Sequence, residues 1–271
     1  MKLFTKVKNR KEILLNFYQL FPIPLVAKLY EMKTSKPFRS YSNYGEDVVL
    51  QGIIRWFIQL GIEINISNLS YIDCGGWHPI KHSNTYWLYK QGNRGTIIEP
   101  NINLKPLWEA VRPEDQFHQI AVADGEIVKY YRIGFAGQGS SIKEDWANSV
   151  TKSENLFIED TVLIESKSLG QIIAIHLNKF SSPYLINIDL EGMDYEVIRQ
   201  TNFNSLAYRP IFVLIEDHNV PEFANDSPIY KQMIKYHYTL ISRAVKTSIY
   251  IDQNSQEFLK YCSLKRKHKD K

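Results

Sequence analysis

The stretch YIDCGGWHPIKHSN, residues 71–84, combines an apolar run that ends at Asp73, two glycines, a bulky loop and the start of a helical pattern. A strand, an acid, a glycine turn and a helix in this order are typical of sites that bind a nucleotide-like cofactor. Gly75 and Gly76 allow the backbone to turn sharply and to approach a ligand closely. The stretch therefore predicts the first strand and the cofactor-binding loop of an α/β fold.

Strand-like and helical segments alternate along most of the chain. Such an alternation with short links predicts a mostly parallel sheet with helices on both faces. We expect one domain over residues 41–262, preceded by an N-terminal helical extension, 1–40, and followed by a basic tail, 263–271. The main predicted strands cover 69–73, 95–100, 117–124, 183–191 and 209–218.

The charge of the chain is concentrated at its end. The formal net charge is +4, and the last seven residues, KRKHKDK, hold five Lys or Arg and one Asp. The rest of the chain is therefore neutral overall, which argues against a nucleic-acid partner. Weak contact of the basic tail or the N-terminal extension with an anionic membrane surface is left open.

Two cysteines do not suggest a disulfide framework, and a reducing cytoplasm is the simpler inference. Asn16, Gln19, Pro22 and Pro24 break the apolar run near the N-terminus, and no stretch reaches the length of a transmembrane helix. We therefore expect a cytoplasmic protein, with a location peripheral to the inner face of the membrane as the alternative.

Acidic residues end the main predicted strands. In an open parallel sheet, ligands bind beyond the carboxyl ends of the strands, so these acids are expected to face one ligand. Glu99 follows Asp73 at about the spacing at which an acid accepts hydrogen bonds from ribose hydroxyls. The loop is not G-x-G-x-x-G, and Pro79 has no N–H to offer a pyrophosphate. A cofactor with a ribose and no phosphates, S-adenosylmethionine, therefore fits better than a dinucleotide.

Six segments follow one another in order within residues 42–216: SNYGEDVVL, YIDCGG, SNTYWLY, GTIIEPN, IDLEGMDYEVI and RPIFVLIE. This ordered set resembles the FkbM-type methyltransferase family. The resemblance implies a class I methyltransferase (Rossmann-like) fold, whose seven-stranded sheet is mostly parallel with an antiparallel last strand. It also implies S-adenosylmethionine as cofactor and methylation of a hydroxyl on a sugar or natural product.

Carried over to this sequence, the resemblance implies a set of cofactor-binding residues, with Glu99 at the ribose and Asp124 near the adenine. Trp77 and Pro79 depart from the Asn and Gly that the family has more often at these positions. The cofactor-binding set is Asp73, Gly75, Gly76, Asn84, Glu99 and Asp124.

Asp189, Glu216 and Asp217 follow the fourth and fifth main strands. Their placement resembles the magnesium site of catechol O-methyltransferase-like enzymes. Mg²⁺ takes oxygen ligands and would orient two hydroxyls while lowering the pKa of the one that attacks. In the alternative interpretation, the acids hydrogen-bond to backbone or substrate without a metal.

A hydroxyl acceptor needs a base. His218 follows the acid pair directly and has a suitable intrinsic pKa. Asp189 or Glu191 acting directly, and His78 or His82 from the first loop, are the alternatives.

The leading interpretation is an S-adenosylmethionine-dependent O-methyltransferase that acts on a sugar or glycan. The acceptor is left open as free, nucleotide-linked or lipid-linked, and so is a homodimer. The alternative is a non-catalytic FkbM-like binding or scaffold module.

Overall fold

The computed structural model describes residues 39–134, 137–180, 183–218 and 225–269. The predicted N-terminal extension therefore lies outside the described residues, except for residues 39 and 40. Among the described helices, none combines the length and the apolar character needed to cross a membrane.

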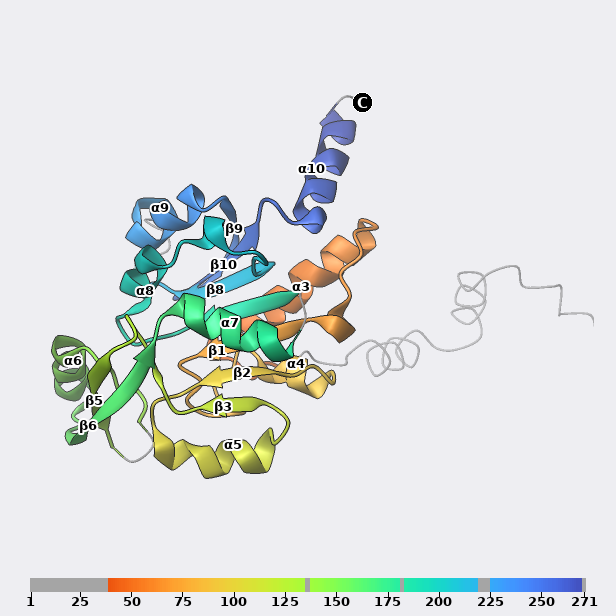
Figure 1. The fold of residues 1–271 in the computed structure, drawn as a ribbon. Coiled ribbons are helices and arrows are strands. Elements are labelled where there is room, and N and C mark those ends of the chain that lie inside the picture. The colour runs from red at the N-terminus through yellow and green to blue at the C-terminus, as the bar shows by residue number, and fades with distance from the viewer. Residues whose placement is uncertain (1–38, 135–136, 181–182, 219–224, 270–271) are drawn as a thin grey trace, which may run out of the picture. The chain divides into compact units, whose positions relative to one another are not determined.

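A seven-stranded sheet forms the centre of the fold, with the strand order β3-β2-β1-β7-β8-β10-β9 (Figure 1). The pairs from β3 to β8 are parallel, and β10 runs antiparallel to both of its neighbours. This is the sheet of class I methyltransferases, so the predicted fold is confirmed. The strands are β1 Ser70–Cys74, β2 Gly95–Ile98, β3 Gln116–His118, β7 Tyr184–Ile188, β8 Phe212–Glu216, β9 Tyr238–Ala244 and β10 Thr247–Asp252.

The central strands are apolar along nearly their whole length because helices cover both faces of the sheet. Every residue of β1, β2 and β7 is buried, as expected for a parallel sheet with no solvent-facing side. Neighbouring residues along β1 alternate between the two cores, Tyr71 on one face and Ile72 on the other. The rigid centre of the sheet thus fixes where the strand ends lie.

Helices α3, α4 and α5 contribute to one core, and α7, α8 and α9 contribute to the other. Ser168 starts α7 with a reciprocal capping box to Gln171. Tyr261 of α10 stacks on Phe57 of α3, and residues 263–269 of the predicted basic tail continue α10. The α-helices are α3 Glu46–Gln59, α4 Tyr86–Lys90, α5 Lys105–Val111, α6 Glu144–Glu154, α7 Leu169–Lys179, α8 Asp194–Gln200, α9 Pro228–Lys235 and α10 Gln256–Lys269; the 3-10 turns are Ile66–Asn68, Ile102–Leu104 and Phe203–Ser205.

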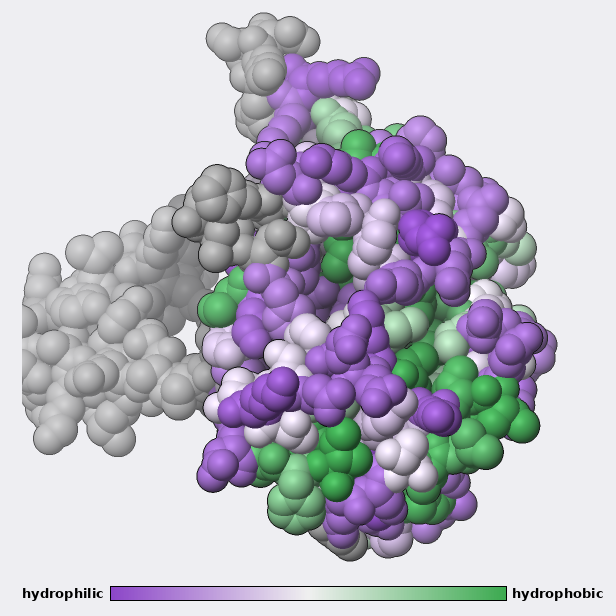
Figure 2. Space-filling view, turned by 90° about the vertical axis from the view of Figure 1, so that its left-hand side faces the viewer, coloured by the Kyte–Doolittle hydropathy of each residue, from purple (hydrophilic) through white to green (hydrophobic). Residues whose placement is uncertain are grey.

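A second, three-stranded sheet stands at one side of the central sheet, together with α6 (Figure 1). It consists of β4 Ala121–Val122, β6 Ile158–Lys167 and β5 Ile127–Ile133, in this order. The segment 117–124, predicted as one strand, is therefore divided between two sheets. Figure 2 shows this side of the molecule, with hydrophobic side chains gathered in the lower half of the view. Ile127 of β5 and Leu163 of β6 are 72% and 73% exposed.

His176 of α7 ties its helix to the central sheet. Its ring is fully buried, with Nε2 2.9 Å from Ser70 Oγ of β1 and Nδ1 3.0 Å from Thr96 Oγ1 of β2. Burial lowers the pKa of this imidazole from 6.5 to about 4. The ring is therefore neutral in the folded protein at any pH above about 4.

We expect His176 to make the fold sensitive to acid. The pKa of His176 is lower in the folded than in the unfolded protein, so the unfolded protein binds a proton first as the pH falls. The contribution of the neutral imidazole to stability is therefore complete above pH 6.5 and decreases as the pH falls toward 4. Over this window the free energy of unfolding should drop by ~3 kcal/mol, at about 1.4 kcal/mol per pKa unit. Urea unfolding of the wild type and a His176→Gln variant at several pH values tests this, because other titrating groups cancel in the difference. Parallel pH profiles for the two proteins would contradict it.

Candidate active site

A cavity of about 600 Å³ lies at the carboxyl ends of the central parallel strands. Its wall includes the acids that end β1, β7 and β8, together with Glu99 after β2. The convergence follows from the topology, because the carboxyl ends of parallel strands meet at one edge of the sheet. Of the predicted acids, Asp73, Glu99, Asp189 and Glu216 line this cavity.

Both glycines of the first loop are required by their neighbours. Gly75 has a φ of 81°, and a Cβ at this position would lie 1.8 Å from the carbonyl oxygen of Asp189. A Cβ on Gly76 would lie 2.6 Å from Cγ2 of Ile97. The backbone N–H groups of both glycines donate to the carbonyl of Ile98. The loop is thus clamped between β2 and β7, and both glycines line the cavity.

Glu99 is a buried carboxylate that the backbone holds in place. Its Oε2 accepts from the N–H of Trp77 at 2.8 Å, and its Oε1 accepts from the N–H of Asn101 at 2.7 Å. Burial raises the pKa of Glu99 to about 7, although these two hydrogen bonds act in the opposite direction. A carboxylate has about four acceptor positions, so two remain for a ligand.

Asp73 is linked to Asn84 by two hydrogen bonds that pass through the side-chain amide of Asn187. Its Oδ1 accepts from Asn187 Nδ2 at 2.9 Å, and Asn187 Oδ1 accepts from Asn84 Nδ2 at 2.9 Å. Asn84 is only 7% exposed and lines the cavity, and its Oδ1 has no hydrogen-bond partner among the residues that the structure describes. An unsatisfied buried acceptor is costly, and it marks a position for a ligand donor such as an ammonium group.

Asp124 is not brought to the cavity. The chain leaves the central sheet at His118, and Ala121–Val122 pairs with β6 of the small sheet instead. Asp124 is consequently exposed, and its carboxylate accepts a 3.4 Å hydrogen bond from the N–H of Glu126. Ala121 and Val122 line the cavity in its place, so an apolar wall stands where an acid was expected.

A second acid group of the cavity consists of Asp189, Glu191 and Glu216, with His218 beside Glu216. The Nε2 of His218 lies 3.1 Å from Oε2 of Glu216, and the hydrogen bond to this carboxylate raises the pKa of the His218 imidazole. Burial and the charge of Glu216 raise the pKa of Asp189. Glu216 itself has a lowered pKa, because His218 and Asp189 outweigh the effect of burial. The two carboxyl groups share a hydrogen bond, and the opposite directions of their pKa shifts favour the proton on Asp189.

Trp146 of α6 closes this end of the cavity. Its indole Nε1 donates to Glu191 Oε2 at 3.2 Å, and its ring centroid lies 4.8 Å from that of His218. Glu191 has a φ of 49°, an uncommon conformation for a residue with a side chain, and Ser141 Oγ donates to its carbonyl at 2.9 Å. Such strain is often found at functional sites. Helix α6 thus shapes the wall of the cavity around Glu191 and His218.

Asp217 faces away from the cavity, which corrects the predicted magnesium site. Neighbouring residues in an extended strand point to opposite sides, and Asp217 follows the last residue of β8. Its Oδ2 lies 3.5 Å from Nη1 of Arg243, and its side chain is almost fully buried. Among residues 39–269, apart from the gaps given above, no three His, Cys, Asp or Glu side chains are arranged to hold a metal ion. The residues present do not fit the predicted ion.

The prediction did not include Thr85 and Asn187, which hydrogen-bond to Asp73, or Arg112, which hydrogen-bonds to Thr85. Asn187 carried a signal, because a carboxamide interrupts the apolar run YLINI of β7. Thr85 and Arg112 carried none, because their roles depend on contacts between segments that are distant in the sequence.

The family model for the "Methyltransferase FkbM domain" matches residues 73–243. No curated protein matches the sequence. Among solved structures, a methyltransferase FkbM from Methylobacillus flagellatus KT is similar at 14% identity and a TM-score of 0.34, over 84% of this chain and 60% of that chain. This chain thus spans 60% of the length of that structure.

A second solved structure is that of a 1,6-didemethyltoxoflavin-N1-methyltransferase from Burkholderia thailandensis, with bound 1,6-didemethyltoxoflavin and S-adenosylhomocysteine. It is similar at 11% identity and a TM-score of 0.31, over 93% of this chain and 91% of that chain.

Proposed function

The chain belongs to the FkbM methyltransferase family, and from this premise we propose that it transfers the methyl group of S-adenosylmethionine to a hydroxyl of a sugar or glycan. The observation that carries the proposal is that two sets of side chains line one cavity, here called its first and second parts. One part holds the fixed carboxylate of Glu99 and the free acceptor of Asn84. The other part holds Trp146, the acids and His218.

The first part fits the cofactor. Glu99 keeps acceptor positions for two ribose hydroxyls, and Asn84 Oδ1 is a buried acceptor suited to the amino group at the other end. Gly75 and Gly76 line the same cavity without a side chain. When bound, S-adenosylmethionine supplies an electrophilic methyl group on a sulfonium ion. The intact cofactor part argues against the alternative of a non-catalytic module.

The second part suits an acceptor with several hydroxyls. Glu191 and Glu216 offer hydrogen-bond acceptors, and Asp189, whose pKa is raised by burial and by Glu216, offers a donor when it carries the proton. The indole of Trp146 provides a flat apolar face of the kind on which sugar rings pack, and it also contacts His218. His218, paired with Glu216, takes the proton from the attacking hydroxyl.

Methyl transfer can be tested with isotope-labelled S-adenosylmethionine and a panel of free sugars, amino sugars, nucleotide sugars and lipid-linked glycans. We expect labelled methyl on an acceptor oxygen, located by NMR. A Trp146→Ala variant should raise the acceptor KM by about tenfold, in line with the loss of an aromatic contact, while Trp146→Phe should keep most of the affinity. Label found only on nitrogen, or no transfer by a protein that binds S-adenosylhomocysteine, would contradict the proposal.

A further inference from the structure

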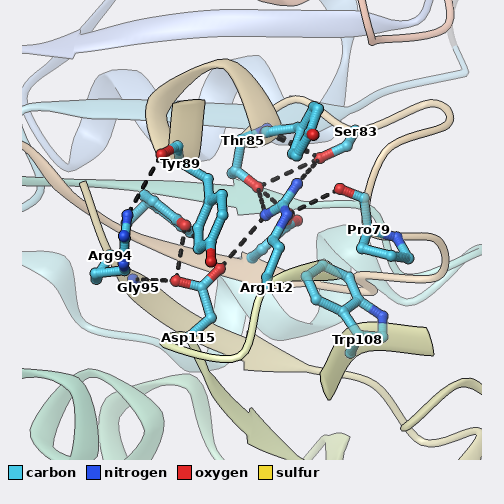
Figure 3. A network of polar contacts seen from close by, with 12 residues as sticks. Pro79, Ser83, Thr85, Tyr89, Arg94, Gly95, Trp108, Arg112 and Asp115 are labelled. Carbon is cyan, nitrogen blue, oxygen red and sulfur yellow. Dashed lines mark hydrogen bonds and ion pairs between the residues drawn. The ribbon is translucent and has the colours of Figure 1, made fainter. Parts of the chain in front are cut away.

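The guanidinium of Arg112 lies buried behind the cofactor-binding loop (Figure 3). Arg112 follows α5, and its side chain is fully shielded from solvent. Its Nε donates to the carbonyl of Pro79 at 2.8 Å, its Nη1 to Thr85 Oγ1 at 2.9 Å, and its Nη2 to Ser83 Oγ at 2.6 Å. One rigid side chain therefore holds both ends of the segment 79–85.

The charge of Arg112 is matched by a second buried group. Asp115 Oδ2 lies 3.6 Å from Nη1, and the same carboxylate accepts from Tyr71 Oη and from the N–H of Gly95. The ring of Trp108 lies 4.7 Å from the guanidinium carbon. A buried ion pair is seldom more stabilising than apolar residues of the same volume, so stability alone does not explain this arrangement.

The contacts of Arg112 impose a direction on the hydrogen bonds beyond it. Thr85 Oγ1 accepts from Arg112, so its single proton is free to go to Asp73 Oδ2, 2.5 Å away. The other oxygen of Asp73 accepts from the amide of Asn187. The carbonyl oxygen of Asn187 must then face the NH₂ of Asn84, which leaves Asn84 Oδ1 for the cavity.

Ser83 secures the other side of Asn84. Its Oγ accepts from Arg112 and also from the N–H of Tyr86, at the start of α4. Asn84 thus lies between two residues that the same guanidinium anchors. The loop has further anchors, because the N–H of Ser83 donates to the carbonyl of Tyr41 and the indole of Trp108 donates to the carbonyl of Trp77, but these hydrogen bonds do not involve Asn84 or Thr85.

We propose that Arg112 is a positioning residue of the cofactor site, which acts through Ser83 and Thr85 to aim Asn84 Oδ1 at the amino-acid end of S-adenosylmethionine. The inference rests on the proposed function and deepens it. It predicts that a break between Arg112 and Asp73 weakens recognition of the amino-acid end alone, while the ribose and adenine contacts remain.

The test compares S-adenosylhomocysteine with 5′-methylthioadenosine, which lacks the amino-acid end. Thr85→Val keeps the shape and removes the hydroxyl, and Thr85→Ser is its matched control. By calorimetry, Thr85→Val should bind S-adenosylhomocysteine about tenfold more weakly and 5′-methylthioadenosine within about twofold of wild type. Thr85→Ser should restore both affinities. Asn84→Ala should show the same selective loss, and the double variant Asn84→Ala/Thr85→Val should lose no more than either alone.

Several outcomes would overturn the inference. Equal losses for both ligands, or a lower melting temperature with an unchanged ratio of the two affinities, would show a role in folding only. If Thr85→Val does not fold, Ser83→Ala tests the other contact of Arg112, and an unchanged ratio there has the same meaning. A wild type that binds neither ligand would instead refute the proposed function itself.

Discussion

A Glu99→Gln variant is expected to bind S-adenosylhomocysteine about 100-fold more weakly than wild type, because two charge-assisted hydrogen bonds to the ribose are lost. The amide also places an NH₂ group against one of the N–H donors, of Trp77 or Asn101, that now hold the carboxylate. Calorimetry measures the change. Asp124→Asn is the matched control, because this exposed acid lies outside the cavity, and its affinity should stay within about twofold of wild type.

The same carboxylate should make cofactor binding depend on pH. The ribose hydroxyls donate to the ionised form, and burial raises the pKa of Glu99 to about 7. Protonation therefore competes with the cofactor below pH 7, and the affinity should fall by up to about tenfold per pH unit as the pH decreases. Above pH 7 the affinity should be constant, and Glu99→Gln should show no such slope. A loss in Asp124→Asn equal to that in Glu99→Gln would return the adenine-binding role to Asp124.

The fold was predictable because the central strands are read from local patterns. Short apolar runs, each ending in a polar residue and separated by helical segments, are sufficient to indicate a parallel sheet. The one division that was missed, in FHQIAVAD, depends on the pairing of Ala121 and Val122 with β6, far along the chain. An apolar run alone does not reveal that its second half joins another sheet, and the misplacement of Asp124 follows from that single omission.

Two features of the site show which errors were avoidable. Glu216 and Asp217 were grouped as metal ligands, although the two-residue period of a strand sends neighbouring side chains to opposite sides. Asp217 accordingly pairs with Arg243 of β9 and lies outside the cavity. The contact of Arg112 with Thr85 is of the other kind, because it joins the end of α5 to the start of α4 and no local pattern contains it.

Loss of the general base is the second change expected to have a large effect. The contacts of the predicted candidates argue for some of them and against others. Burial and Glu216 raise the pKa of Asp189, which disfavours the ionised form that a base requires. Glu191 accepts a hydrogen bond from Trp146 and also has a raised pKa, caused first by burial and then by Glu216. His78 Nδ1 accepts from the N–H groups of Ile80 and Lys81, so it caps a turn. His82 and His218 are the histidines among the described residues that line the cavity.

Between these two, His218 has the partner that a general base needs. Glu216, 3.1 Å away, orients the ring and stabilises the imidazolium that forms, whereas the ring of His82 packs against Trp77, with 5.4 Å between centroids. We expect His218→Asn to lower kcat by about 1,000-fold, within the usual range for a general base, without changing the affinity for S-adenosylhomocysteine. His82→Asn is the matched control and should lower kcat by less than about fivefold. Equal losses of activity in the two variants, or a larger loss in His82→Asn, would contradict the assignment of His218 as the base.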